Sequence, residues 1–256
     1  LDELKQAVID HQGKIALISI MASNNEVGTL QDIAQVVKIA GQIPVHSDCV
    51  QSFGKVSLSF KNLGLTAATI SAHKVGGPLG VAALILKRGL DIEPILHGGG
   101  QERDIRSGTF NAPSIVSFAA AAKESVAQSE QRSEIIRKLK AELISTIKKG
   151  VPDIWVNGDQ VKSLPGIISI TFPKTDSEGL LLLLDSEGIA CSTGSACSAG
   201  VQRPSHVLLA MGLTEDETTS TLRFSLNHSN TIVEIAKLGA VIASVVARSR
   251  AASGKK

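Results

Sequence analysis

The chain has 256 residues, 43% of them hydrophobic, so it can bury one large core or two smaller ones. A formal net charge of +2 and an aromatic content of 3% exclude the basic, aromatic-rich surfaces that bind nucleic acids. The longest strongly apolar run, residues 180–184, is far too short to span a membrane, so we expect neither nucleic-acid nor membrane partners.

The first 130 residues alternate between short β-rich segments and segments with helical spacing. They begin inside an amphipathic helix, with no visible secretory or transit segment. Such alternation is typical of an α/β sheet that binds its ligand at the strand ends. We predict strands over residues 14–20, 43–47, 67–71 and 81–86, and helices over residues 30–40 and 113–128.

Beyond residue 130 the pattern changes character. We therefore predict a large domain over residues 1–130 and a small α+β domain over residues 131–256. The tail over residues 253–256 is expected to be disordered. In this half we predict helices over residues 134–149, 180–184, 207–211 and 229–246, and strands over residues 166–172 and 221–226.

One lysine lies between an apolar strand and a glycine-rich turn, in the run Ser71–Gly80. The glycines let the backbone approach a ligand, and partial desolvation of Lys74 favours a nucleophilic amine that attacks an aldehyde. The structural alternative is a lysine that extends from a strand end into water. Asp48 ends an earlier apolar strand and can hold a pyridinium proton, so the two residues match the two ends of pyridoxal phosphate.

Further motifs follow one another along nearly the whole chain. They are Asn24-Asn25-Glu26-Val27-Gly28, Asp48-x-x-Gln51, Ser71-x-His73-Lys74, His97–Arg103, Arg106–Thr109, Cys191–Gly200, Pro204–Leu208 and Leu222–Ser225. This ordered set closely resembles a cysteine desulfurase of the class V aminotransferase-like superfamily. The resemblance implies the fold type I of pyridoxal phosphate-dependent transferases: a mixed, mostly parallel sheet with helices on both faces, plus a smaller α+β C-terminal domain.

The resemblance also implies a cofactor site for pyridoxal 5′-phosphate. Lys74 is then the Schiff-base lysine, and Asp48 is the partner of the pyridine nitrogen. Ser71 and His73 are phosphate ligands, and Thr109 reaches the phosphate from the neighbouring subunit of a homodimer.

For the substrate, the resemblance places Asn25 and Gln51 near the ring hydroxyl and the bound L-cysteine. Arg223 holds the substrate carboxylate, a bidentate task that suits a guanidinium. Cys197 lies in a small, polar segment that we expect to be mobile and exposed. It is implied to attack the substrate sulfur, which leaves alanine and an enzyme persulfide for iron–sulfur cluster or thio-cofactor assembly.

The remaining cysteines and histidines carry weaker signals. Cys191 reads as a buried strand thiol, and we leave Cys49 out of the mechanism. The spacing of Cys191 and Cys197 argues against a metal site, and an odd cysteine count argues against a disulfide framework. His97 contacts either the cofactor surroundings or backbone, and His206 supports the Cys197 loop.

Three functions remain open. The first is a cytoplasmic cysteine desulfurase that passes sulfur to an iron–sulfur scaffold or another acceptor protein. The second is a selenocysteine lyase or related lyase of the same fold, and the third is a truncated, non-catalytic protein that dimerises or docks on a scaffold. Family members carry an N-terminal region with a glycine-threonine phosphate-binding turn and a ring-stacking histidine. We therefore expect either a fragment of a longer protein or a chain with weak or absent activity.

Overall fold

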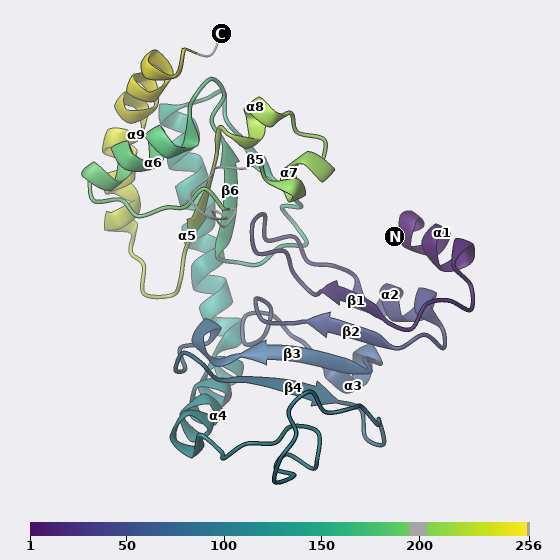
Figure 1. Ribbon diagram of the computed structural model, residues 1–256. Coiled ribbons are helices and arrows are strands. Elements are labelled where there is room, and N and C mark those ends of the chain that lie inside the picture. The colour runs from purple at the N-terminus through teal and green to yellow at the C-terminus, as the bar shows by residue number, and fades with distance from the viewer. Residues whose placement is uncertain (195–203, 255–256) are drawn as a thin grey trace. The chain divides into compact units, whose positions relative to one another are not determined.

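The computed structural model describes residues 1–194 and 204–254, and the chain divides into two compact units (Figure 1). Unit 1 comprises Leu1–Ser23 and Gln31–Ser129. Unit 2 comprises Asn24–Leu30 and Glu130–Lys256. The short segment 24–30 therefore belongs to the second unit, although its chain neighbours on both sides belong to the first.

A four-stranded sheet with the order β1-β2-β3-β4 forms the centre of unit 1. The first three strands run parallel, and the fourth pairs antiparallel with the third. The sheet is thus mixed and mostly parallel, as the sequence predicted. Its strands are β1 (Ile18–Met21), β2 (Val45–Asp48), β3 (Ala67–Ser71) and β4 (Ala82–Leu86).

Local capping decides where the helices of unit 1 begin. The predicted helix over residues 30–40 starts only at Ile33, because the Asp32 side chain accepts a hydrogen bond from the Gln35 amide and caps the first turn. Gly41 ends this helix with a φ of 59°, a conformation that glycine adopts readily. The elements are α1 (Asp2–Asp10), α2 (Ile33–Ala40), α3 (Phe60–Leu63), α4 (Ala112–Ala127) and the 3-10 turn η1 (Ala72–Lys74).

One polar side chain links the three parallel strands. Nδ1 of His46 lies 2.8 Å from the Ser19 hydroxyl on β1, and Nε2 lies 2.9 Å from the Thr69 hydroxyl on β3. Both ring nitrogens are thereby satisfied, so His46 is structural. Around it, Val36 of α2, Ala68 of β3 and their neighbours form the apolar core of this unit.

Unit 2 is built on a three-stranded antiparallel sheet with the order β5-β6-β7. Every residue of the central strand β6 is buried. The helix predicted over residues 134–149 begins five residues earlier, at Ser129. Residues 129–132, which we expected to lead into the helix, form its first turn. The elements are α5 (Ser129–Gly150), β5 (Trp155–Asn157), β6 (Ile167–Thr171), α6 (Ser177–Ser186), α7 (His206–Ala210), α8 (Glu215–Thr218), β7 (Thr221–Ser225) and α9 (Ile232–Ser253).

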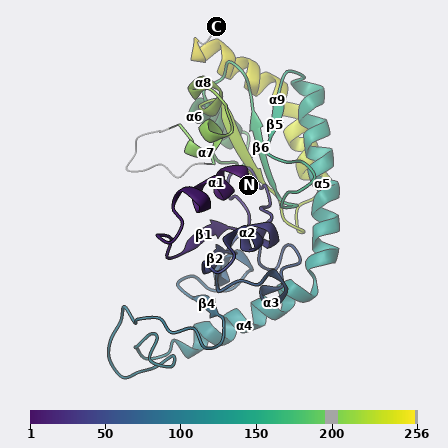
Figure 2. The ribbon, with the colours of Figure 1, turned by 90° about the vertical axis from the view of Figure 1, so that its right-hand side faces the viewer.

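The core of unit 2 lies between its sheet and its long helices. Leu143 of α5, Leu180 of α6 and Ile242 of α9 pack with β6 and β7, and Figure 2 shows α5 and α9 beside the strands. Phe172 directly follows β6 and is completely buried. Its ring meets that of Phe224 edge to face, with 6.4 Å between the centroids.

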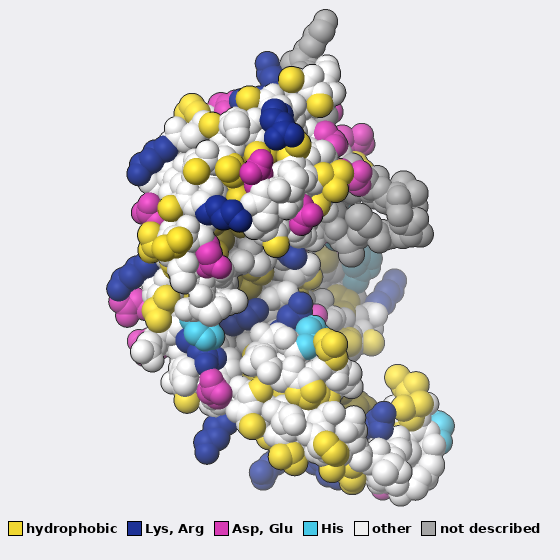
Figure 3. All heavy atoms as spheres, turned by 90° about the vertical axis from the view of Figure 1, so that its left-hand side faces the viewer, with side chains coloured by type: hydrophobic (Ala, Val, Ile, Leu, Met, Phe, Trp, Pro, Cys, Tyr) yellow, Lys and Arg dark blue, Asp and Glu magenta, His cyan; other side chains and the backbone are white. Residues whose placement is uncertain are grey.

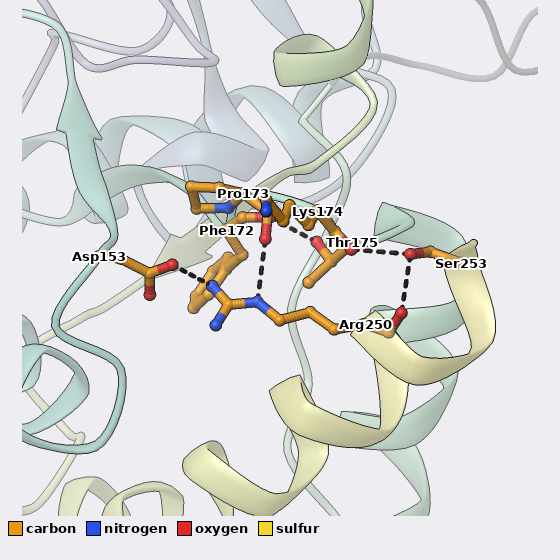
Figure 4. A network of polar contacts seen from close by, with 7 residues as sticks. All are labelled: Asp153, Phe172, Pro173, Lys174, Thr175, Arg250 and Ser253. Atoms are coloured by element: carbon orange, nitrogen blue, oxygen red, sulfur yellow. Dashed lines mark hydrogen bonds and ion pairs between the residues drawn. The ribbon is translucent and has the colours of Figure 1, made fainter. Parts of the chain in front are cut away.

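The end of α9 is fixed by polar contacts (Figure 4). Arg250 pairs with Asp153 at 2.7 Å and donates through Nε to the Pro173 carbonyl at 3.0 Å. The Ser253 hydroxyl donates to the Lys174 carbonyl at 2.7 Å. The expectation that the tail is disordered from residue 253 is therefore wrong for Ser253, which these contacts hold in the helix. Residues 255 and 256 lie outside the described part.

Segment 24–30 is bound to unit 2 through its backbone. The Gly28 carbonyl accepts from the Leu164 amide at 2.8 Å, and Thr29 forms a bridge with Ser163. A Cβ on Gly28 would stand 3.2 Å from the side chain of Ile167, so little room remains for any other residue there. The early segment thus lies against β6 of unit 2.

The surface offers no large field of one sign on the face that Figure 3 draws. Basic and acidic side chains are interspersed there, in line with the small net charge. Among the helices that the structure describes, none combines the length and the apolar character that crossing a membrane requires.

Candidate active site

An acid and an amine lie at one edge of the sheet of unit 1. β2 and β3 are parallel neighbours, so their carboxyl ends meet at the same edge. β2 ends at Asp48, which is exposed, and β3 continues through Ser71 into η1, which ends at Lys74. The register pairs Asp48 with Thr69, two residues before the end of β3. The strands thereby place both residues at the same edge of the sheet.

Two further polar groups stand beside Lys74. The buried Ser71 hydroxyl lies 2.8 Å from Nδ1 of the exposed His73. A hydroxyl and an imidazole at the carboxyl edge of a sheet can donate hydrogen bonds to an anion such as a phosphate.

The partial desolvation predicted for Lys74 is not observed, because this residue is exposed. It ends a single 3-10 turn, and the following residues Gly76 and Gly77 have no side chains that could cover its amine. The glycine run that suggested close approach of a ligand thus also leaves the lysine open to water.

A second amine in this region, that of Lys55, is less exposed to solvent than the amine of Lys74. Its Nζ is partly buried and donates to Oε1 of Gln51 at 3.0 Å. Burial, and then the positive charge of Lys74, lower the pKa of Lys55 to about 8. Sequence reasoning assigned Lys55 no role, and no sequence motif marked it.

In unit 2, Arg223 occupies the middle of β7 and is half-buried. Its Nη1 donates to the Asn25 carbonyl at 2.9 Å, while its backbone pairs in both directions with Ser192. Its Nε is buried and has no hydrogen-bond partner within residues 1–194 and 204–254. The guanidinium is therefore held in place with a donor left for an anionic ligand.

A buried carboxylate lies next to Asn25 in the chain. Glu26 accepts a hydrogen bond of 2.6 Å from the Ser205 hydroxyl, which in turn caps α7 by accepting from the Leu208 amide. The sequence motifs contained both residues, but neither had received a role. Cys197, the predicted nucleophile, lies outside the described residues.

The other two cysteines are packed against apolar cores. Cys49 is buried in the core of unit 1, and burial raises the pKa of its thiol. Cys191 was predicted to be a strand thiol, but it directly precedes the single bridge residue Ser192 and lies in no strand. It is half-buried against the core of unit 2, and burial, followed by the charge of Asp185, raises its pKa to about 11.

This shift predicts slow alkylation of Cys191. Because only the thiolate reacts, a pKa of about 11 instead of 9.0 lowers the reactive fraction about 100-fold at pH 8. In the native protein, the rate with iodoacetamide should keep rising up to about pH 11, whereas in urea it should level off near pH 9. Mass spectrometry of the Cys191 peptide measures both profiles. A native plateau near pH 9 would contradict the burial.

Three other predicted positions are exposed. Thr109 and His97 lie on the connection between β4 and α4, and His206 is the first residue of α7. The contribution of Thr109 to a neighbouring subunit stays a prediction. Within the part of the chain that the structure describes, no group of three or more histidine, cysteine or acidic side chains is arranged to hold a metal ion.

Known proteins resemble this chain over almost its full length. The model of the family described as "Aminotransferase class-V" matches residues 1–238. An "IscS-like cysteine desulfurase" of Mycobacterium tuberculosis is 42% identical over 253 residues, which are 98% of this chain and 64% of that protein. A "Cysteine desulfurase IscS" of Methanosarcina thermophila is 39% identical over 97% of this chain and 61% of its own length.

A solved structure gives the same result for the fold. The NifS-like protein from Rickettsia africae superimposes with a TM-score of 0.87 at 36% identity, over 95% of this chain and 65% of that one. The fold class predicted from the sequence is thereby confirmed. The chain spans less than two thirds of the length of each of these three proteins.

Proposed function

The chain belongs to the aminotransferase class-V family, and on this premise we propose that it is, or is part of, a pyridoxal phosphate-dependent cysteine desulfurase. It takes L-cysteine, releases L-alanine and passes the sulfur on as a persulfide of Cys197. The relatives that bear the name cysteine desulfurase support this substrate.

One observation carries the proposal: Asp48 and Lys74 lie at the carboxyl edge of two neighbouring parallel strands. With Ser71 and His73 they supply a carboxylate, an amine, a hydroxyl and an imidazole. This donor set fits the pyridine nitrogen, the aldehyde and the phosphate of pyridoxal phosphate. When bound, the cofactor supplies an electron sink for the carbon that bears the amino group.

The first unit holds the cofactor and moves the proton. Lys74 would hold the aldehyde end of the cofactor covalently, and its amine, when free, could carry a proton to and from the substrate carbon. Asp48 keeps the ring nitrogen protonated. Its Oδ1 already accepts from the Val50 amide at 2.9 Å, which leaves Oδ2 for the ring N–H. Gln51 provides its amide for the ring hydroxyl.

The second unit binds the substrate carboxylate through Arg223. The guanidinium is oriented by its bond to the Asn25 carbonyl, and its buried Nε is a donor without a partner among the described residues. A carboxylate satisfies that donor in a charge-assisted bond. Asn25, whose backbone orients the arginine, offers its side-chain amide to the substrate.

Cys197 is the proposed sulfur acceptor. Its thiolate attacks the sulfur of the bound cysteine, so that a sulfur–sulfur bond forms and the Cβ–S bond of the substrate breaks. The electron pair of the broken bond goes to the carbon fragment, which takes up a proton and leaves as alanine. An iron–sulfur scaffold or another acceptor protein then removes the outer sulfur.

We further propose a cytoplasmic homodimer. Unit 1 exposes large apolar side chains that a second copy can cover, and the exposed Thr109 would reach the partner's phosphate. These side chains are Leu79, Leu84, Ile95, Phe110 and Val116.

Borohydride reduction after incubation with pyridoxal phosphate tests the proposal. The reagent fixes the cofactor on the lysine that carries it, and peptide mass mapping identifies that lysine. We expect the label on Lys74 and no label in Lys74→Ala. A label confined to other lysines, or none at all, would overturn the assignment.

Replacement of Cys197 then separates the desulfurase from the two other functions. In a desulfurase, Cys197→Ser keeps the label on Lys74 and loses persulfide formation. Sulfide release at the full rate, or turnover of selenocysteine alone, would favour a lyase of the same fold. A protein that dimerises without taking up cofactor would favour the non-catalytic function.

A further inference from the structure

The segment after β2 forms a hydrogen-bonded turn that carries Gln51. The amides of Ser52 and Phe53 donate to the Cys49 carbonyl, at 3.1 and 2.8 Å, and the amides of Lys55 and Val56 donate to the Ser52 carbonyl, both at 3.1 Å. Across this turn Nζ of Lys55 donates to Oε1 of Gln51 at 3.0 Å, so the two side chains lie next to each other.

The turn is fixed from two sides within unit 1. The hydroxyls of Ser23 and Ser52 are hydrogen-bonded at 2.6 Å in a buried position, and the Ser125 hydroxyl donates to the Gly54 carbonyl at 3.1 Å. Gly54 has a φ of +70°, and a Cβ there would collide with the Ser125 hydroxyl. The backbone under Gln51 and Lys55 therefore has little freedom to move.

The hydrogen bond between the two side chains has a direction. A lysine ammonium can only donate, so the oxygen of the Gln51 carboxamide must face Lys55, as it does at 3.0 Å. The amide NH₂ of Gln51 then points away from Lys55. Without Lys55 the carboxamide could turn over, since its two ends are nearly equal in size.

Lys55 is also partly buried. Holding an ammonium partly out of water costs free energy, and the lowered pKa of about 8 reflects that cost and the nearby charge of Lys74.

We propose that Lys55 is a positioning residue for the cofactor: it holds the Gln51 carboxamide with its NH₂ directed at the ring oxygen of pyridoxal phosphate. The inference rests on the proposed function and adds to it a residue with no previous role. Lys55 acts through Gln51 and takes no part in bond making.

The test compares Lys55→Met with Lys55→Arg and with Lys61→Met, an exposed lysine on α3 that serves as the matched control. Cofactor affinity is measured by titration of the purified protein with pyridoxal phosphate, together with the visible absorption of the bound cofactor. Loss of one oriented hydrogen bond should weaken affinity about 10-fold in Lys55→Met and shift the absorption. Lys55→Arg should restore both, because a guanidinium also only donates.

A double-mutant cycle makes the test specific. If Lys55 acts through Gln51, then Gln51→Leu weakens affinity as much as Lys55→Met does, and the double variant is no worse than either. Additive losses, or unchanged affinity and absorption in a Lys55→Met protein that still labels on Lys74, would overturn the inference alone. A wild-type protein that takes no label on Lys74 would overturn the proposed function as well.

Discussion

Lys74→Ala is expected to lower the release of alanine and sulfide from cysteine by at least about 1,000-fold. The variant loses both the covalent anchor of the cofactor and the group that moves a proton at the substrate carbon, and a positioned general acid–base alone contributes 10²- to 10⁴-fold. Because Lys74 is exposed at the end of η1, its truncation leaves no cavity in a core. The free energy of unfolding should therefore stay within about 0.5 kcal/mol of wild type.

Two comparisons isolate the role of the amine. Lys61→Ala removes a comparably exposed lysine from the same unit and should keep full turnover. A small primary amine such as ethylamine, added to Lys74→Ala, should recover part of the lost rate, because it supplies the missing base in solution. Full activity of Lys74→Ala without added amine would show that another residue carries the cofactor.

Phe172→Ala is expected to lower the free energy of unfolding of unit 2 by about 3–5 kcal/mol. Phe172 directly follows β6 in the chain, and its side chain is completely buried. Its loss removes the edge-to-face contact with Phe224. Urea unfolding followed by the fluorescence of Trp155, the single tryptophan of this sequence, reports on unit 2, because Trp155 lies on β5. The midpoint should fall with an unchanged slope.

Leu182→Ala is the matched control for this experiment. Leu182 lies on α6 and is 67% exposed, so its truncation should change the free energy of unfolding by no more than about 0.5 kcal/mol. Equal losses in the two variants would mean that Phe172 is not a centre of the core.

The sequence allowed the order of the elements to be predicted, because hydrophobic periodicity is a local property. The four strands of unit 1 overlap the β-rich segments, although β1 begins at Ile18 and not at residue 14. Asp48 ends a strand and Lys74 follows one, as expected. The predicted helix bounds are wrong where a single side chain or contact determines the end of the helix. Asp32 delays the start of α2, and the contacts of Ser253 extend α9.

The parts of the site that sequence reasoning missed depend on contacts between distant residues. Glu26 accepts a hydrogen bond from Ser205, which lies 179 positions away in the sequence. Arg223 donates one to the Asn25 carbonyl, 198 positions away. Lys55 is different, since its partner is four residues away, but whether it is buried depends on the tertiary fold. Exposure could not be predicted for the same reason: Lys74 was expected to be partly desolvated, and the structure leaves its amine open to water.

The place of segment 24–30 in unit 2 has a consequence for synthesis on the ribosome. This segment is made among the first residues described here, yet its partners around Ser163, Ser205 and Arg223 appear more than 130 positions later. Loop closure over such lengths is slow, and no native contact of the segment with β7 can form before Arg223 has left the exit tunnel. Until then the Asn25 carbonyl lacks its contact with Arg223, and chaperones and proteases can reach the incomplete nascent chain.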